Sequence, residues 1–140
     1  MSGFILDASV TLPWRFEDEA TPWTESLLNR LEQGEAAVVP AHWPLEVVNA
    51  LLFALRRKRV TSEQIREFLD DLAVLPVRID SAPTRDQWSS VLALAEQHRL
   101  TAYDAAYLEL SLRARLPLAT LDGDLRKAAM TEGVALLETT

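Results

Sequence analysis

The stretch FILDAS, residues 4–9, sets the fold: three apolar residues are followed at once by a carboxylate. An apolar run this short, bounded by polar residues and by Pro13, predicts a buried strand. Asp7 then stands at the C-terminal end of that strand. Sites in open α/β sheets are built at this edge. Other carboxylates that reach the same edge are therefore candidates for a functional site.

Length and composition predict one globular domain spanning residues 1–140, with 49% hydrophobic and 25% charged residues. The sequence contains no cysteine, which excludes a disulfide framework, a thiolate metal site and a cysteine nucleophile. His42 and His98 are too few for the usual zinc chemistry, and we interpret both as structural. The net charge of −7 repels a polyanion, so nucleic-acid binding requires a local basic patch or bound cations.

The sequence carries no signal for a membrane. Its apolar runs fall short of the roughly 18 residues that a membrane span needs. The first three residues, MSG, lack the basic start of a signal peptide. We therefore expect a cytoplasmic protein with no membrane partner.

Strand-like and helix-like segments alternate along the chain. We expect strands near residues 4–6, 36–39, 77–79, 118–121 and 134–137. Helices are expected near residues 20–33, 44–59, 61–72, 84–95, 101–114 and 122–130, two of them opened by Thr-to-Gln capping boxes. This alternation predicts an α/β fold with a mainly parallel sheet of about five strands, covered by helices on both faces.

Acidic residues from separate segments converge in this arrangement. Asp7 ends the first strand, and Asp122 ends the fourth, with Asp124 two residues further on. The ends of parallel strands share one edge of the sheet. Glu46 lies on the helix after the second strand among apolar residues, where an un-neutralised carboxylate is costly to bury. Asp104 stands in the first turn of its helix, in a largely apolar neighbourhood.

Each acidic residue also has a structural interpretation. Asp104 would complete a capping box with Thr101, Asp122 would cap the helix that follows it, and Asp7 would cap a following helical turn. Glu46 resists such an interpretation because its helix already has a start. Four carboxylates at one edge would repel one another and raise their pKa values unless a cation lay between them. Hard oxygen ligands favour Mg²⁺ or Mn²⁺ over zinc.

Taken together, these residues resemble the PIN-domain ribonucleases and, within them, the VapC-like toxins of toxin–antitoxin pairs. The resemblance rests on the order and spacing of four motifs: ILDAS (5–9), EVVN (46–49), TAYDAAY (101–107) and LATLDGDL (118–125). It implies a three-layer α/β/α sandwich. It also implies an acidic quartet around a metal ion, formed by Asp7, Glu46, Asp104 and Asp122, with Ser9, Asn49 and Thr120 in support. Asp124 matches a frequently acidic position as well, so the choice between Asp122 and Asp124 stays open.

The activity that the resemblance implies is hydrolysis of RNA phosphodiester bonds by an endoribonuclease toxin that uses Mg²⁺ or Mn²⁺. Metal-activated water needs no side-chain nucleophile, which agrees with the absence of a Ser-His or Cys-His arrangement. The implied partners are an RNA substrate, a cognate antitoxin and a second copy of the chain in a homodimer.

RNA binding requires cations around the site, although such residues are usually solvated helix ends. The candidates are Arg15, Arg56–Arg59, Arg113, Arg115 and Arg126–Lys127. Trp14, Phe16 and Trp23 belong either to the core or, if exposed, to a patch that receives a partner helix.

Other functions fit parts of the same pattern. A metal-free interaction module of PIN fold would carry the carboxylates as relics or helix caps. A metal-dependent phosphatase would use similar ligands. A phospho-receiver domain would need a lysine at a late strand end, and neither Lys58 nor Lys127 ends a predicted strand.

Overall fold

The computed structural model describes residues 3–81 and 83–138. In this part of the chain, four parallel strands form one sheet in the order β3-β2-β1-β4. The strands are β1 (Phe4–Leu6), β2 (Ala37–Val39), β3 (Val77–Ile79) and β4 (Leu118–Ala119). The helices are α1 (Ala8–Thr11), α2 (Pro22–Glu32), α3 (Trp43–Arg56), α4 (Ser62–Ala73), α5 (Arg85–His98), α6 (Ala102–Ala114) and α7 (Gly123–Thr131), with 3₁₀ turns at η1 (Leu12–Trp14) and η2 (Glu17–Glu19).

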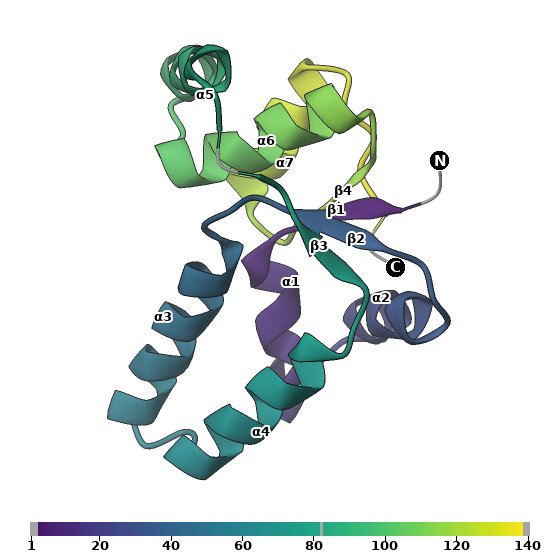
Figure 1. Ribbon diagram of the computed structural model, residues 1–140, viewed down its shortest axis with the longest axis vertical. Coiled ribbons are helices and arrows are strands. Elements are labelled where there is room, and N and C mark those ends of the chain that lie inside the picture. The colour runs from purple at the N-terminus through teal and green to yellow at the C-terminus, as the bar shows by residue number, and fades with distance from the viewer. Residues whose placement is uncertain (1–2, 82, 139–140) are drawn as a thin grey trace.

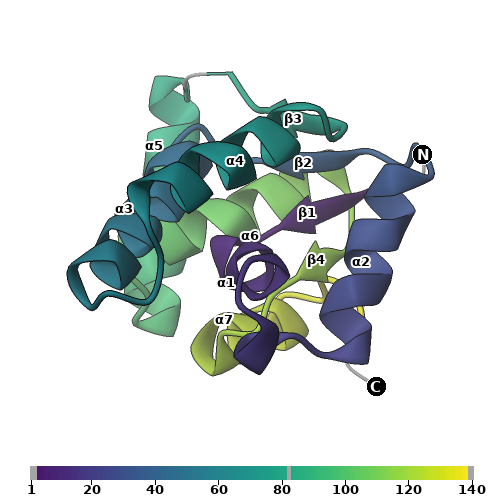
Figure 2. The same ribbon diagram turned by 90° about the horizontal axis from the view of Figure 1, so that it is seen from below.

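Helices cover both faces of the sheet, which confirms the predicted α/β sandwich. In Figure 1, α5, α6 and α7 lie above the sheet and α1 to α4 lie below it, and Figure 2 shows the lower layer from beneath. The three residues of β1 are completely buried. This follows from the central position of β1, since strands of a parallel sheet are enclosed from both sides.

Local signals placed most helix starts correctly. Thr61 and Gln64 form the predicted capping box at the start of α4, with reciprocal bonds of 3.0 and 3.1 Å. Thr84 and Gln87 do the same for α5. In both boxes the side chains bind backbone N–H groups that have no partner inside the helix.

Several boundaries differ from the prediction: β4, expected over residues 118–121, ends at Ala119, and α5, expected to end at residue 95, continues to His98. The fifth strand, expected at residues 134–137, is reduced to a single parallel bridge between Leu118 and Leu136. The segment does run beside β4, but β4 is only two residues long and offers no further pair. The helix expected to reach residue 59 ends at Arg56, because Lys58 adopts a left-handed backbone with φ of 61°. The short α1 after Asp7 was not among the expected helices.

The N-terminal aromatic residues belong to the core. Phe16 and Trp23 are buried, and the half-buried Trp14 donates its indole N–H to the Thr24 carbonyl at 2.7 Å. The core interpretation is therefore confirmed, and the alternative of an exposed aromatic patch is wrong.

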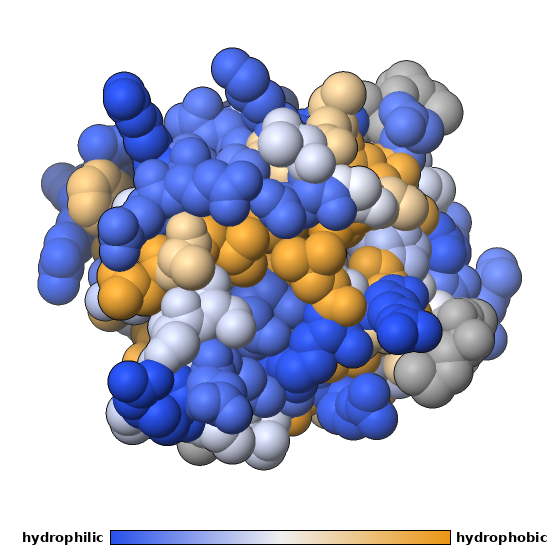
Figure 3. Space-filling view, turned by 90° about the horizontal axis from the view of Figure 1, so that it is seen from above, coloured by the Kyte–Doolittle hydropathy of each residue, from blue (hydrophilic) through white to orange (hydrophobic). Residues whose placement is uncertain are grey.

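Apolar side chains are also exposed in the upper layer. Figure 3 shows a band of apolar surface between hydrophilic margins on that face. Among the residues of the upper layer, Trp88 and Leu92 of α5 and Leu112 of α6 are exposed. No helix within the described ranges is both long and apolar enough to cross a membrane.

Candidate metal centre

Neighbouring strand ends bring Asp7 and Thr120 together. β1 and β4 pair in register through Leu6 and Ala119, so the next residue of each strand emerges at the same edge. The backbone N–H of Asp7 donates to the Ala119 carbonyl at 3.0 Å, which carries the pairing past the end of β1. This bond fixes the backbone of Asp7 and so restricts where its side chain can lie.

The Asp7 carboxylate is buried and held by two hydroxyl groups. Its Oδ2 accepts a bond from Ser9 Oγ at 2.7 Å and another from Thr120 Oγ1 at 2.6 Å. The same hydroxyl oxygens accept from the backbone N–H groups of Leu121 and Asp122, each at 3.0 Å. Ser9 and Thr120 therefore tie the carboxylate to the loop that leads from β4 into α7.

Burial dominates the electrostatics of Asp7. It raises the pKa of this carboxyl, the bonds from Thr120 and Ser9 lower it, and nearby Glu46 raises it again, so the pKa stays above its usual value. Asp7 occupies the position that would cap α1, but its side chain makes no cap bond. The capping interpretation of Asp7 is therefore wrong.

Glu46 lies in the first turn of α3 and is half-buried. Its Oε1 accepts from the Tyr107 hydroxyl at 2.5 Å and lies 3.2 Å from His42 Nε2. Burial raises the pKa of Glu46, but the bonds from His42 and Tyr107 outweigh it, and the pKa falls below its usual value. The ionised form of Glu46 is therefore favoured.

Tyr107 and His42 were missed as members of the centre, although the sequence held a signal for each. A tyrosine deep in an apolar helix needs a partner for its hydroxyl, and Tyr107 belongs to the same motif as Asp104. His42 precedes Glu46 by four residues, a spacing that brings two side chains together on a helix.

Asp104 stands in the first turn of α6, as predicted, but it does not complete a capping box. Its backbone N–H donates to Thr101 Oγ1 at 3.1 Å, while the reciprocal bond from its carboxylate to the Thr101 N–H does not form. Burial raises the pKa of Asp104 to about 6, and the charges of Asp122, Asp7 and Glu46 add to the rise. The charges of the other three carboxylates of the predicted quartet therefore all act on Asp104.

Asp122 and Asp124 have different surroundings. Asp122 accepts the Leu125 N–H at 3.0 Å, which confirms that it caps α7, and its charge also acts on Asp104. Asp124 is exposed and lines a separate cavity between α5 and α7 together with Lys127. Of the two aspartates, Asp122 is therefore the one that interacts with the carboxylate centre.

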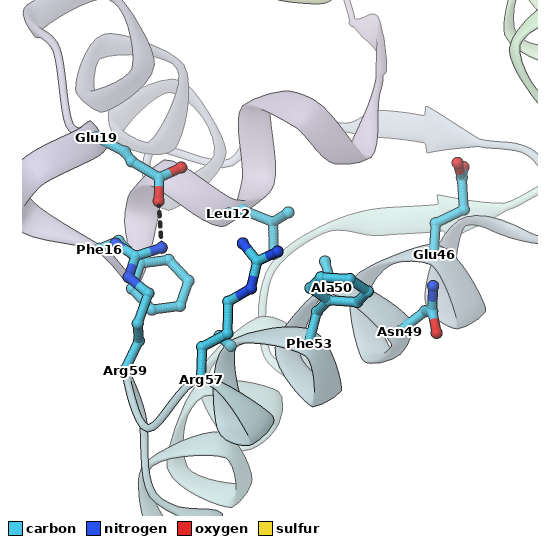
Figure 4. Close-up of a pocket in the computed structure, with 10 residues that line it drawn as sticks. Leu12, Phe16, Glu19, Glu46, Asn49, Ala50, Phe53, Arg57 and Arg59 are labelled. Carbon is cyan, nitrogen blue, oxygen red and sulfur yellow. Dashed lines mark hydrogen bonds and ion pairs between the residues drawn. The ribbon is translucent and has the colours of Figure 1, made fainter.

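Asn49 lies one turn after Glu46 and is exposed. Both residues line a groove of about 420 Å³ between α3 and the η1 region, whose walls include Leu12 and Phe53. Figure 4 shows Glu46 and Asn49 at one end of this groove and two arginines at the other. Asn49 therefore belongs to the groove that leads away from the carboxylates.

Several of the candidate cations are already engaged. Arg59 pairs with Asp18 and Glu19, and Arg113 pairs with Asp80 and Glu109. Arg126 donates to the Thr120 carbonyl at 3.1 Å. Arg57 instead lies over the Phe53 ring, 4.6 Å from its centre, inside the groove of Figure 4.

The donor set fits a hard divalent cation by its chemistry, since it consists of carboxylate oxygens whose mutual repulsion a cation would relieve. Throughout residues 3–81 and 83–138, however, no three Asp, Glu or His side chains stand close enough to form a ready-made metal cage. The carboxylates therefore lie close enough for their charges to interact, but they do not surround a single point in space.

The chain is similar in sequence to a known ribonuclease and in fold to solved structures. Ribonuclease VapC12 of Mycobacterium tuberculosis is 29% identical over 124 residues, covering 89% of this chain and 90% of its own length. The crystal structure of PAE2754 from Pyrobaculum aerophilum superposes with a TM-score of 0.71 at 21% identity, covering 91% of this chain and 84% of that one. The structure of VapBC2 from Rickettsia felis bound to a promoter DNA fragment gives a TM-score of 0.65 at 14% identity, covering 96% and 97% of the two chains.

The sequence profile of the PIN domain matches residues 4–130. That range contains every residue of the centre described above. The resemblance found in the four motifs is confirmed, and this chain belongs to the PIN domain family.

Proposed function

We propose that this PIN domain is an endoribonuclease that requires Mg²⁺ or Mn²⁺ and serves as the toxin of a toxin–antitoxin pair. The observation that carries the proposal is the convergence of four carboxylates: burial and the charges of Asp122, Asp7 and Glu46 together raise the pKa of Asp104 to about 6. The similarity to ribonuclease VapC12 along 89% of the chain supports RNA as the substrate.

The residues that would hold the cation are Asp7, Glu46, Asp104 and Asp122. When bound, a divalent cation supplies Lewis-acid chemistry, making water more acidic and neutralising charge on a phosphate. Rotation of the half-buried Asp104 side chain would bring the donors closer together.

The chain itself holds these donors in place. Ser9 and Thr120 orient Asp7 through its Oδ2. The cap bond to Leu125 fixes Asp122 at the start of α7. The donors thus start from defined positions, which limits the entropy lost when a phosphodiester and a cation are bound.

Water is the nucleophile that suits this centre. The hydroxyl protons of Ser9 and Thr120 are both donated to Asp7, so neither oxygen is activated for attack. In the hydrolysis, a bond forms between phosphorus and the water oxygen, the bond from phosphorus to the leaving oxygen breaks, and that oxygen takes up a proton. Carboxylates around the phosphate are suited to carry the proton between the two oxygens.

An antitoxin and a second copy of the chain complete the proposal as partners. The groove lined by Leu12, Phe53 and Arg57 combines apolar walls with a cation, a surface that suits an amphipathic helix bearing acidic residues. Light scattering of the purified chain, alone and co-expressed with the protein encoded beside it, tests both expectations. A monomer that forms no complex would contradict them.

Cleavage of a mixed RNA pool tests the enzymatic part. Wild-type protein is incubated with Mg²⁺, with Mn²⁺ and with EDTA, beside Asp104→Asn and the matched control Asp124→Asn, all purified identically. We expect cation-dependent cleavage that Asp104→Asn loses and Asp124→Asn keeps. Equal cleavage by wild type and Asp104→Asn would show that the activity is a contaminant or arises elsewhere. Cation binding without cleavage would favour a phosphatase or an interaction module.

A further inference from the structure

Tyr107 is a fully buried residue of α6 whose hydroxyl points at a carboxylate. Its O–H donates to Glu46 Oε1 at 2.5 Å, across 61 positions of the chain. The Ala8 backbone also bonds to this hydroxyl. The phenol therefore lies where α1, α3 and α6 meet.

A phenylalanine would fill the same core position without needing an acceptor. Burial of a phenol hydroxyl is favourable only when a partner is supplied, and a bond to an ionised carboxylate is stronger than one to a neutral group. Burial, with Asp7 and Glu46 nearby, raises the pKa of Tyr107 far above its usual value. The hydroxyl consequently remains a proton donor to Glu46 at any physiological pH.

His42 holds the same carboxylate from the other side. Its Nε2 lies 3.1 Å from the Tyr103 carbonyl oxygen and 3.2 Å from Glu46 Oε1. The carbonyl can only accept and the Glu46 carboxylate is ionised, so the hydrogen must reside on Nε2. The His42 ring also packs edge-on against Tyr107, with ring centres 5.4 Å apart.

Through these contacts His42 links two elements of the centre. Tyr103 immediately precedes Asp104 at the start of α6, while Glu46 is on α3. A shared donor between the Tyr103 carbonyl and Glu46 therefore sets the position of one acidic helix relative to the other.

The two donors converge on the same oxygen. Tyr107 and His42 both engage Oε1 of Glu46, and Oε2 receives no protein donor from the residues that the structure describes. A carboxylate held through one oxygen has its orientation restricted while its second oxygen stays free to bind a cation.

We infer that Tyr107 and His42 are positioning residues that fix Glu46 through Oε1 and leave Oε2 to a divalent cation. The inference rests on the proposed function, because it assigns Glu46 to the cation. Outer-shell partners of metal-binding groups typically change metal affinity by about 10- to 100-fold when they are removed.

Mn²⁺ affinity, measured by electron paramagnetic resonance of the free ion, tests this inference without any enzymatic readout. The Tyr107→Phe variant deletes one hydroxyl and keeps the ring. Its matched control is Tyr103→Phe on the same helix, because the Tyr103 side chain is 63% exposed and its hydroxyl makes no bond to the described residues. We expect Tyr107→Phe to weaken Mn²⁺ binding about 10-fold and Tyr103→Phe to leave it unchanged.

His42 supplies a second pair of variants, which keeps the test decisive if Tyr107→Phe fails to fold. His42→Phe preserves the aromatic packing but removes the donor, whereas His42→Gln offers an N–H near the position of Nε2. We expect His42→Phe to weaken Mn²⁺ binding and His42→Gln to restore most of it. A role in packing alone predicts the opposite order.

RNA cleavage in the same samples separates this inference from the proposed function. Equal Mn²⁺ affinity in wild type, Tyr107→Phe and His42→Phe would overturn the inference, even if all three cleave RNA. Weakened affinity in both variants would support it, even if none of them cleaves RNA, in which case only the proposed function would fail. A wild-type protein that binds no Mn²⁺ would overturn the inference outright.

Discussion

The two sides of the carboxylate centre are built differently. On the side formed by β1 and α3, Asp7 accepts two hydroxyl bonds, while Glu46 accepts the Tyr107 hydroxyl bond and lies 3.2 Å from His42 Nε2. On the side formed by α6, the Thr101 hydroxyl is the weakest influence on the pKa of Asp104 and lowers it, while the charges of three other carboxylates raise it. Two acidic residues are thus held in place, while a third carries most of the repulsion.

This difference between the two sides indicates where a bound cation would stabilise the protein most. Hydrogen bonds hold Asp7 and Glu46 whether or not a cation is present, because their donors belong to the fold. The position of Asp104 is costly until a positive charge arrives. Fixed donors on one side and relieved repulsion on the other would together give a centre that is preorganised yet binds its cation strongly.

Breaking the anchored side gives the largest expected effect. Asp7→Asn replaces a charged acceptor of two hydroxyl bonds with a neutral amide, so both cation binding and charge neutralisation are lost. Several kcal/mol of transition-state stabilisation correspond to a loss of at least about 100-fold in cleavage rate. The rate is measured on a fluorescent RNA, with Asp124→Asn as the control. A loss below tenfold would remove Asp7 from the centre.

A cation should compensate the repulsion on the α6 side. Mn²⁺ at about 100 times its Kd stabilises the folded protein by about 2.7 kcal/mol, which for a chain of this size raises Tm by roughly 8 °C. Differential scanning fluorimetry of wild type and Asp104→Asn measures the rise, and Ca²⁺-free EDTA buffer gives the baseline. An equal rise in both proteins would place the cation elsewhere.

Removing one of the two hydroxyl donors to Asp7 should lower the stability of the protein. Ser9→Ala removes one of the two donors to the buried Asp7 and leaves the Leu121 N–H without its acceptor. Because the acceptor is charged, we expect a loss of about 1.5 kcal/mol in the free energy of unfolding. Urea denaturation measures it against Ser26→Ala, whose hydroxyl bonds only to a carbonyl of its own helix. Equal losses would mean that the Ser9 bond to Asp7 contributes nothing special.

The α6 side of the centre should make the stability of the protein depend on pH. Without metal, the pKa of Asp104 is 3.8 in the unfolded chain and about 6 when folded. Between these values the folded protein binds the extra proton, so stability falls as pH rises through this window and recovers on acidification. The group is partly exposed, so we expect only about 1 kcal/mol. Denaturation in EDTA at pH 4.5 and pH 7 measures this difference, which Asp104→Asn should reduce.

Local patterns in the sequence were sufficient for much of the fold. The capping boxes of α4 and α5 depend on residues three positions apart, and the burial of β1 follows from its apolar run and parallel neighbours. The length of β4 was overestimated because the hydroxyl of Thr120 turns toward Asp7 and its segment leaves the strand. A side-chain bond over 113 positions has no local signature.

The candidate site divides in the same way. Asp7, Glu46 and Asp104 stand out as acidic residues in apolar or strand-end contexts, whereas the sequence left Asp122 and Asp124 both open as the fourth acidic residue. By itself, the sequence also determined that the fold alternates strands and helices, because short apolar runs indicate the buried strands and a period of 3.6 residues indicates the helices.

Only the tertiary structure decided which groups meet. It brought Asp122 near enough for its charge to act on Asp104 and placed Asp124 in a separate cavity together with Lys127, although the two aspartates are separated by one glycine. It also brought the Tyr107 hydroxyl and the His42 ring onto one oxygen of Glu46. The physical reason is that such contacts depend on strand order, helix packing and the direction of each loop, which act between distant segments and leave no period in the sequence.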